Sequence, residues 1–540
     1  MSLLRIQGLT VALPPGADRP HAVEEISLHV DPGEILCVVG ESGSGKSITA
    51  NAVMGLLPRG LPVRAGSMEL LGQNLLGLGP EAMRRLRGDR MAMIFQEPMT
   101  ALNPLMRVGD QIAEAMRVHG ATPGTRVLEL LEAVRLPDPK AIAQSHPFRL
   151  SGGQRQRVMI AMALALEPAL LIADEPTTAL DVTTQMSILR LIRDIQQRRG
   201  TGVLFITHDF GVVAEIADRV AVMRHGRIVE QGAAAEVLNA PQHDYTKALI
   251  AAVPRGAAPP RGPHGGRTQA VAQIGADLLR VTGLRKTYTR GGWIGGRVSV
   301  PAVQDADFTL ARGETLGVVG ESGSGKSTLA RCIVKLVVPE SGEIRFDGTD
   351  LRPLSRAAWK PFRSRVQMIF QDPYASLNPR RLVGEAIAEG PITHGVPRAE
   401  ALARARELLA LVQLDLSAMD RYPHEFSGGQ RQRIGIARAL AMRPELLIAD
   451  EPVSALDVSV QAQVLGLLAD IRARFGLTML FITHDLRVAA QICDRVAVMQ
   501  RGVIVEMGRT AQVFANPAHA YTRELLDSIP GQAWTPPVAA

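Results

Sequence analysis

The sequence predicts an α/β fold built from two tandem copies of one domain. Two observations carry this prediction: long motifs recur in the same order in both halves, and short apolar runs alternate with helical segments within each half. The recurring motifs are GESGSGKS at 40–47 and 320–327, SGGQRQR at 151–157 and 427–433, LIADEP at 171–176 and 447–452, and FITHD at 205–209 and 481–485. Four motifs repeated in one order leave no room for coincidence.

The domain boundaries follow from the repeat. We place the first copy at residues 1–254 and the second copy at residues 277–540. The segment 255–276 contains several prolines and glycines and few large apolar residues, which is typical of a linker. A linker of this length can span the width of a domain, so the two copies are free to face one another.

Apolar runs before the motifs indicate a largely parallel sheet in each copy. The runs cover 34–40, 169–174 and 202–209 in the first copy, and 314–320, 445–450 and 478–485 in the second. They are continuously apolar, as strands buried on both faces require. Helices are expected between the strands, which gives the alternation of an α/β domain. The expected helices cover 47–57 and 327–337 and begin at Ser151 and Ser427.

Composition narrows the class of protein. Hydrophobic residues make up 46% of the 540 residues and charged residues 21%, as in ordinary globular proteins. The three cysteines are far apart and lack the CxxC spacing of a zinc or iron–sulfur site, which favours a reducing compartment. The sequence shows neither a clean membrane span nor the basic and apolar regions of a signal peptide. We therefore expect a soluble or peripheral protein.

The motif GESGSGKS matches the phosphate-binding loop pattern G-x-x-x-x-G-K-S. Its glycines let backbone amides curl around a phosphate at the N-terminus of a helix. We expect Lys46 and Lys326 to reach the β- and γ-phosphates, and Ser47 and Ser327 to offer hydroxyl ligands to Mg²⁺. The candidate loop residues are Gly40, Glu41, Ser42, Gly43, Ser44, Gly45, Lys46 and Ser47, and Gly320, Glu321, Ser322, Gly323, Ser324, Gly325, Lys326 and Ser327.

The motif LIADEP places two carboxylates at the end of a buried strand. Asp174 and Asp450 are expected to hold the metal through water, and Glu175 and Glu451 to polarise the attacking water as general bases. Such a pair is by itself more often a capping or surface feature. Its combination with the phosphate loop indicates hydrolysis.

Two further motifs complete each copy. His208 and His484 end an apolar run, from which they could reach a γ-phosphate.

The SGGQ segment opens a long helix and offers backbone amides to an anion, yet the phosphate loop of the same copy already cradles the phosphates. This second anion site therefore needs a ligand brought by another domain. Its residues are Ser151, Gly152, Gly153 and Gln154, and Ser427, Gly428, Gly429 and Gln430.

These motifs, together with IFQEP or IFQDP and ALD, resemble an ATP-binding cassette (ABC) ATPase with two fused nucleotide-binding domains. The resemblance covers nearly the whole chain. It implies that each copy is a P-loop domain with a RecA-like, mostly parallel sheet core, a small antiparallel β subdomain and a helical signature subdomain. It also implies that the two domains pair head to tail, with ATP and Mg²⁺ between the phosphate loop of one and the signature segment of the other.

That pairing defines two sites within one chain. Site one combines 40–47, Gln96, Asp174, Glu175 and His208 with 427–430. Site two combines 320–327, Gln371, Asp450, Glu451 and His484 with 151–154.

Two segments of each copy resemble the peptide and nickel importers of bacteria in particular. These are FQ(E/D)P…LNP at 96–104 and 371–379, and PQHDYTKALIAAVP and PAHAYTRELLDSIP at 241–254 and 517–530. The resemblance implies a peripheral ATPase at the cytoplasmic face of the inner membrane that powers two separate permease subunits, fed indirectly by a substrate-binding protein. It also implies that Gln96 and Gln371 contact the metal and sense the γ-phosphate. The cargo stays open among dipeptides, longer peptides, glutathione and metal chelates.

The main alternative is a soluble twin-cassette ATPase that acts on the ribosome or on nucleic acid. The formal net charge of +7 would suit RNA. Such proteins typically join their cassettes by a long, charged, helical linker, whereas this linker is rich in proline and glycine. A silent scaffold is disfavoured because both glutamates and both histidines are present. We therefore expect no nucleic-acid partner.

The resemblance also predicts a difference between the two sites. The family usually stacks an aromatic side chain on adenine, and Tyr288 fits this role in the second copy, whereas the first copy offers only Leu13. Stacking of a base on an aromatic side chain contributes about 1 to 3 kcal/mol. Site one should therefore bind ATP more weakly, with little change in the chemical step.

Measurement of ATP affinity site by site in Lys46→Ala and Lys326→Ala backgrounds checks this expectation, and Leu13→Tyr should strengthen site one. If the two affinities are equal, or if Leu13→Tyr changes nothing, adenine stacking does not distinguish the two copies.

Overall fold

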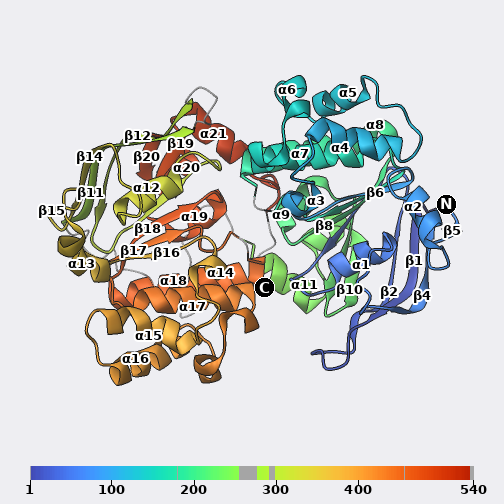
Figure 1. The fold of residues 1–540 in the computed structure, drawn as a ribbon. Coiled ribbons are helices and arrows are strands. Elements are labelled where there is room, and N and C mark those ends of the chain that lie inside the picture. The colour runs from blue at the N-terminus through green and yellow to red at the C-terminus, as the bar shows by residue number, and fades with distance from the viewer. Residues whose placement is uncertain (1, 179, 254–275, 291–297, 455, 536–540) are drawn as a thin grey trace.

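The computed structural model describes residues 2–178, 180–253, 276–290, 298–454 and 456–535. Two lobes, one for each copy, meet along a central seam (Figure 1). Each lobe contains a four-stranded sheet and a six-stranded sheet. The predicted linker, apart from its last residue, lies outside the described residues.

Both copies have the same sheet topology. The four-stranded sheets are antiparallel and have the orders β2-β1-β4-β5 and β12-β11-β14-β15. The six-stranded sheets have the orders β10-β9-β3-β8-β7-β6 and β20-β19-β13-β18-β17-β16, and only their first strand, β10 or β20, runs antiparallel. The predicted α/β class with a mostly parallel core is confirmed.

The strands have the following bounds. In the first copy they are β1 (Leu4–Ala12), β2 (His21–Val30), β3 (Ile35–Val39), β4 (Val63–Leu70), β5 (Gln73–Asn74), β6 (Met91–Ile94), β7 (Leu170–Asp174), β8 (Gly202–Thr207), β9 (Arg219–Arg224) and β10 (Arg227–Ala233). In the second copy they are β11 (Asp277–Arg290), β12 (Val298–Ala311), β13 (Thr315–Val319), β14 (Ser341–Phe346), β15 (Thr349–Asp350), β16 (Val366–Ile369), β17 (Leu446–Asp450), β18 (Thr478–Thr483), β19 (Arg495–Gln500) and β20 (Val503–Arg509).

The helices follow the same repeat, except that the second copy has a 3-10 helix at Leu416–Asp420 where the first copy has α6. In the first copy they are α1 (Lys46–Val53), α2 (Pro80–Leu86), α3 (Pro98–Ala101), α4 (Val108–Arg117), α5 (Arg126–Ala133), α6 (Pro139–Gln144), α7 (Gly152–Ala163), α8 (Val182–Arg199), α9 (Phe210–Ile216), α10 (Ala234–Asn239) and α11 (Asp244–Ala251). In the second copy they are α12 (Lys326–Ile333), α13 (Arg356–Arg365), α14 (Pro373–Ser376), α15 (Val383–Thr393), α16 (Arg398–Leu411), α17 (Gly428–Leu440), α18 (Val458–Phe475), α19 (Leu486–Ile492), α20 (Thr510–Ala515) and α21 (Ala520–Asp527). In the described part of the chain, no helix is both long enough and apolar enough to cross a membrane.

Each six-stranded sheet lies between two hydrophobic cores. Every residue of β3, β7 and β8 is buried, as the continuously apolar runs predicted. One core of each copy fills the space between the two sheets, and the other packs the opposite face of the larger sheet against helices. The two-sided burial holds the strand ends, and the loops that follow them, in fixed positions.

The helices after the phosphate loops are shorter than the sequence predicted. The expected helices reached residues 57 and 337, but α1 ends at Val53 and α12 at Ile333. In the first copy Gly55 adopts a left-handed φ of 61°, and in the second copy Lys335 adopts a φ of 57°. The Lys335 ammonium donates to the carbonyls of Leu351, Arg352 and Leu354 at 3.0, 3.0 and 2.6 Å, so the side chain is anchored just beyond the end of α12.

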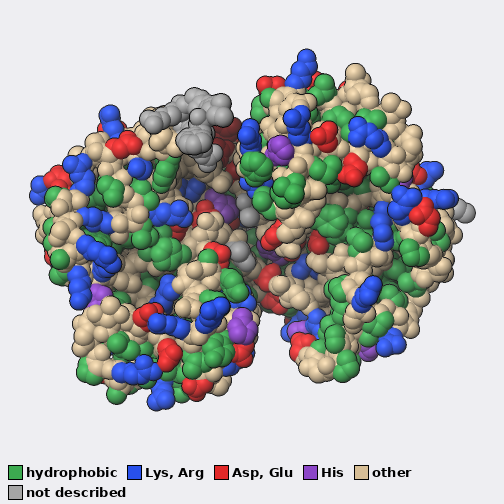
Figure 2. All heavy atoms as spheres, viewed as in Figure 1, with side chains coloured by type: hydrophobic (Ala, Val, Ile, Leu, Met, Phe, Trp, Pro, Cys, Tyr) green, Lys and Arg blue, Asp and Glu red, His purple; other side chains and the backbone are tan. Residues whose placement is uncertain are grey.

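The two lobes share their cores at the seam. Val182, the first residue of α8, packs into the core of the second copy, and Val458, the first residue of α18, packs into the core of the first copy. Figure 2 shows the surface hollowed along the line where the lobes meet. The reciprocal insertion of two apolar side chains fixes the seam at its centre.

One buried pair of positions has exchanged volume between the copies. Cys37 on β3 and Gly317 on β13 are equivalent, because they pair with Val220 and Val496 in matching registers. A Cβ atom added at Gly317 would lie 2.7 Å from Cys493 Sγ, whereas the first copy has Ala217 at the position of Cys493. The first copy therefore carries the sulfur on the strand, and the second copy carries it after the helix.

This exchange predicts a compensating pair of substitutions. Gly317→Cys alone should overpack the second copy and lower its free energy of unfolding by about 1 to 3 kcal/mol. The double variant Gly317→Cys/Cys493→Ala reproduces the arrangement of the first copy and should recover most of that loss. Denaturant unfolding of the four proteins of this cycle measures the effect. Losses that simply add in the double variant would contradict the exchange of volume.

Candidate active site

Each phosphate loop is a tight turn between a buried strand and a helix. A Cβ atom on Gly40 would lie 2.2 Å from the Met223 carbonyl oxygen, so the backbone passes too close for any side chain. Gly45, just before α1, has a φ of 105°, which favours glycine. The second copy repeats both features at Gly320 and Gly325. The predicted loop is therefore required by the backbone as well as by its motif.

The loop lysines lie folded into the loops. Lys46 Nζ donates to the carbonyls of Gly40 and Glu41 at 2.7 and 2.9 Å, and Lys326 Nζ makes the equivalent bonds at 2.8 and 2.7 Å. Burial lowers the pKa of both ammonium groups. A cation that is desolvated in this way gains strongly from an anionic ligand, so the loops are suited to phosphate.

A hydroxyl and a carboxylate lie beside each loop. Ser47 Oγ donates to Asp174 Oδ1 at 3.0 Å, and Ser327 Oγ to Asp450 Oδ1 at 2.8 Å. Burial raises the pKa of Asp174 to about 6 and also raises that of Asp450. Among the described residues, no three His, Cys, Asp or Glu side chains cluster as metal ligands. The oxygen pair fits Mg²⁺, which takes few protein ligands and completes its shell from phosphates and water.

The predicted general bases are held ionised. Glu175 Oε2 accepts from Gln96 Nε2 at 3.0 Å and Thr178 Oγ1 at 3.0 Å, and it lies 3.3 Å from His208 Nδ1. Burial favours the neutral acid, but the hydrogen bond and charge of His208 outweigh it and lower the pKa of Glu175 to about 2. The side chain is therefore a carboxylate, free of a proton, at neutral pH.

The second copy repeats this arrangement. Glu451 Oε2 accepts from Gln371 Nε2 at 2.9 Å and lies 3.2 Å from His484 Nδ1. The His484 interactions outweigh burial here as well and lower the pKa of Glu451. Glu175 and Glu451 both adopt a left-handed backbone conformation, with φ values of 45° and 47°, so the repeat extends to the backbone of the two bases. In this structure the two glutamines therefore orient the bases; their predicted contacts with metal and γ-phosphate remain predictions.

The signature segments form the N-termini of α7 and α17. Ser151 Oγ accepts from the Gln154 backbone at 3.3 Å, and Gln154 Oε1 accepts from the Ser151 backbone at 3.0 Å. Ser427 and Gln430 form the same reciprocal cap. These polar side chains are satisfied within their own helices, so what they offer a ligand is the exposed turn around the first glycine. Within the described residues, no hydrogen bond joins a signature segment to a phosphate loop.

The contacts that cross from one copy to the phosphate loop of the other come from the ALD segments. The Ser42 backbone donates to Asp457 Oδ2 at 3.0 Å, and Ser459 Oγ donates to Glu41. In the opposite direction, Thr183 Oγ1 donates to Glu321. The ALD motif repeats in the sequence, but the repeat alone assigns these residues no role. The repetition of ALD in both copies was the available sign that the segment matters. The position of Asp181 before α8 indicates by itself only a helix cap.

The tail segments also reach the phosphate loops. The Tyr245 hydroxyl on α11 accepts from the Glu41 backbone at 3.2 Å and donates to Glu41 Oε2 at 3.2 Å. The Tyr521 hydroxyl on α21 accepts from the Glu321 backbone at 3.1 Å. From the sequence, these tails indicate only a family resemblance. They hold the first variable residue of each loop in place.

The predicted adenine positions differ in exposure, and stacking of Tyr288 on adenine stays a prediction. The Tyr288 side chain is 38% exposed, with Lys286 Nζ 5.5 Å from the ring centre, whereas Leu13 is half-buried. In the first copy, Arg19 donates to the Gly43 carbonyl of the phosphate loop. Arg19 was missed because it lies in a loop without a repeated motif. The first loop therefore has a cation beside Gly43 that the sequence did not indicate.

Comparison with known proteins identifies the class. The family model described as "ABC transporter" matches residues 23–178 and 303–454, and the model "Oligopeptide/dipeptide transporter, C-terminal region" matches residues 229–276 and 505–534. The chain belongs to the ABC transporter family and carries its ATP-binding domain twice. The predicted family, fold class and ATPase activity are confirmed.

The curated relatives are ATP-binding subunits of importers. The glutathione import ATP-binding protein GsiA of Salmonella typhimurium (strain LT2) is 48% identical over 98% of this chain and 89% of its own length. GsiA of Escherichia coli O157:H7 is 48% identical over 98% of this chain and 90% of its own length. Among solved structures, cbiO1 from Clostridium perfringens, part of the ABC transporter complex cbiONQ, has 30% identity and a TM-score of 0.40, covering 44% of this chain and 91% of its own.

The tail tyrosines give a test of how the loops are held. Tyr245→Phe removes the hydroxyl that bonds Glu41 twice, and a hydrogen bond of this kind contributes about 0.5 to 1.5 kcal/mol. Site one should therefore bind ATP about two- to tenfold more weakly, while site two is unchanged. Tyr521→Phe is the matched control and should weaken site two instead. Equal losses at both sites from either variant would show that the tyrosines act on the whole fold.

Proposed function

We propose that this chain powers the import of peptides or small peptide-like compounds such as glutathione. It would hydrolyse ATP while bound to a pair of membrane permease subunits, and so drive transport through them. The proposal rests on one observation: the tail segment of each copy matches the family model of oligopeptide and dipeptide transporters. The same tails contact both phosphate loops through Tyr245 and Tyr521. The class-specific part of the sequence is thus attached directly to the nucleotide sites.

The arrangement of the site residues supports the following mechanism. The loop amides and Lys46 bind the phosphates of ATP at site one. Glu175 accepts a proton from the attacking water, while His208 and Gln96 hold its carboxylate in position. Ser47 and Asp174 would hold Mg²⁺, which supplies positive charge to the β- and γ-phosphates. Site two uses Lys326, Ser327, Gln371, Asp450, Glu451 and His484 in the same roles.

Both ATP sites are proposed to form within one chain. The ALD segments already touch the opposite loops, as Asp457 and Thr183 show. Closure of the seam around ATP would then bring residues 427–430 to the first loop and residues 151–154 to the second. The linker joins the copies at high effective concentration, which favours this internal pairing over pairing between chains.

We also propose a peripheral position at the cytoplasmic face of the inner membrane. The curated relatives are import subunits, and their task requires contact with permeases. Lys, Arg, Asp and Glu side chains are interspersed on the face shown in Figure 2, whereas nucleic-acid binding favours a continuous basic surface. The import role of the curated relatives and the transporter model matched by the tails disfavour the ribosome or nucleic-acid alternative.

The general bases give the sharpest test of the mechanism. Glu175→Gln/Glu451→Gln should leave ATP binding intact, lower turnover by about 100-fold or more, and trap a compact monomer with ATP. ATP hydrolysis, ATP binding and light scattering measure the three effects. Undiminished turnover would refute the assignment of the bases, and ATP-driven dimers of chains would refute the internal pairing.

Growth tests the cargo class. A host strain that lacks this chain should lose growth on dipeptides or glutathione as the only sulfur source, and should keep growth on sulfate. The unaltered chain should restore growth, whereas the Glu175→Gln/Glu451→Gln variant should not. Normal growth of the deleted strain on all peptides tested would refute the cargo class while leaving the ATPase assignment intact.

A further inference from the structure

A single arginine breaks the symmetry of the repeat at the seam. His208 and His484 are each followed by an aspartate and then a short helix, α9 or α19. Two residues after the aspartate, the second copy has Arg487, whereas the first copy has Gly211. A Cβ atom at Gly211 would lie 2.6 Å from Arg487 Nη1. The glycine of the first copy therefore leaves the space that the arginine of the second copy occupies.

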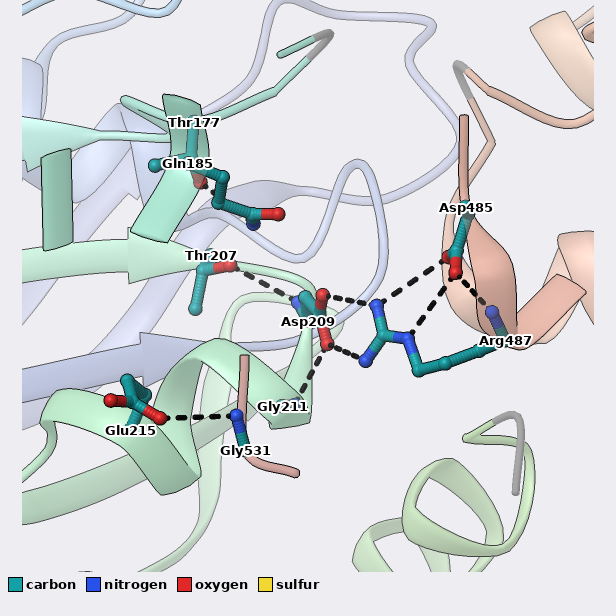
Figure 3. Close-up of polar contacts among 9 residues, drawn as sticks. All are labelled: Thr177, Gln185, Thr207, Asp209, Gly211, Glu215, Asp485, Arg487 and Gly531. Carbon is teal, nitrogen blue, oxygen red and sulfur yellow. Dashed lines mark hydrogen bonds and ion pairs between the residues drawn. The ribbon is translucent and has the colours of Figure 1, made fainter. Parts of the chain in front are cut away.

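The arginine bridges two carboxylates across the seam (Figure 3). Its Nη2 donates to Asp209 Oδ2 at 2.8 Å and its Nη1 to Asp209 Oδ1 at 3.4 Å, in the opposite copy. Its Nε and Nη2 also contact Asp485 of its own copy at 3.4 and 3.5 Å. The three side chains are only 15%, 18% and 21% exposed for Arg487, Asp209 and Asp485. Among the described residues this is the only ion pair between the copies.

Both aspartates are tied to the histidines that precede them. The Asp209 backbone donates to Thr207 Oγ1 at 3.1 Å, and Asp209 Oδ1 accepts from the Gly211 backbone at 2.7 Å, so it starts α9. Asp485 makes the equivalent bonds to Thr483 and the Arg487 backbone, at 3.0 and 2.8 Å. A shift of either carboxylate therefore shifts the adjacent histidine, which lies 3.2 or 3.3 Å from its general base.

The surroundings of the bridge leave room for such a shift. A cavity of about 90 Å³ lies at the seam and is lined by matching residues of both copies, including Gln185 and Gln461, and both histidines. Burial would raise the pKa of Asp209, but the charge of Arg487 outweighs it and lowers that pKa. Removal of Arg487 would thus leave a buried carboxylate without its cation, which strongly perturbs its position.

We propose that Arg487 is a positioning residue that couples the two hydrolytic centres, because its guanidinium joins the carboxylates that directly follow both histidines. A continuous path leads from Glu175 to Glu451 through side-chain contacts and through the peptide bonds that join each histidine to its aspartate. It runs through His208, Asp209, Arg487, Asp485 and His484. The inference rests on the proposed roles of the glutamates and histidines. It adds a route by which the state of one site alters the base of the other.

The test measures how one site depends on the other. Glu175→Gln blocks site one, and the turnover that remains reports site two; Glu451→Gln does the reverse. With Arg487 present, blocking either site should lower the turnover of the other by about fivefold or more, if the smallest typical coupling between two binding sites sets the scale. With Arg487→Gln, each remaining site should keep its turnover within about twofold, and ATP affinity should be unchanged.

An arginine within the second copy provides the matched control. Arg472 on α18 pairs with Asp494 at 2.6 Å and does not cross the seam, so Arg472→Gln should leave the mutual dependence of the sites intact. Asp209→Asn keeps the size of the side chain and should uncouple the sites as Arg487→Gln does, with no further effect when the two are combined. It also serves as the second variant if Arg487→Gln folds poorly.

The proposal is overturned if the sites are independent when Arg487 is present, or if Arg487→Gln slows both sites but leaves their mutual dependence intact. The latter result would make the arginine a structural clamp only. Full activity of Glu175→Gln/Glu451→Gln would instead refute the proposed bases, so failure of the coupling and failure of the mechanism are distinguishable.

Discussion

The order of four parallel strands determines the whole site. In the first copy the phosphate loop follows β3, His208 follows β8, Asp174 and Glu175 lie at the end of β7, and Gln96 follows β6, and these strands are neighbours in the sheet. Parallel strands end at one edge of their sheet, where ligands bind in α/β proteins. The topology therefore gathers groups that are up to about 170 residues apart, before any side-chain interaction acts. The hydrogen bonds to Glu175 only refine what the sheet order provides.

Much of this was predictable from the sequence. Continuous apolar runs predicted the buried strands, and the repeated motifs predicted the two copies, because both can be seen in the order of the residues alone. The phosphate loop, the acidic pair and the histidine were also predictable, since each lies directly at the end of such a strand. The ends of α1 and α12 were not, because Gly55 and Lys335 take a left-handed conformation that depends on the packing around them.

The contacts between the copies were beyond sequence reasoning for a different reason. Asp457 at Ser42 and Thr183 at Glu321 join residues whose proximity depends on how whole domains are placed. Tyr245 at Glu41 lies within the first copy, but it joins residues 204 apart in the sequence. Local propensity describes each residue as a helix cap or a helical tyrosine and says nothing of its partner. Arg487 and Gly211 were hidden in the same way, because a single difference between two repeats has a meaning only when both are seen in contact.

The Gly211 and Arg487 pair bears on why the two copies form one polypeptide with unlike halves. Two first copies placed together would oppose aspartate to aspartate with no cation, and two second copies would crowd two guanidinium groups into space that only a glycine provides. Each half is thus a poor partner for itself. The covalent tether sets how often the halves meet, while this pair of side chains sets which halves fit. Gene fusion and partner identity are therefore separate properties of the molecule. Substitution of Gly211 or Arg487 would weaken the preference of each half for the other, while the covalent link would remain.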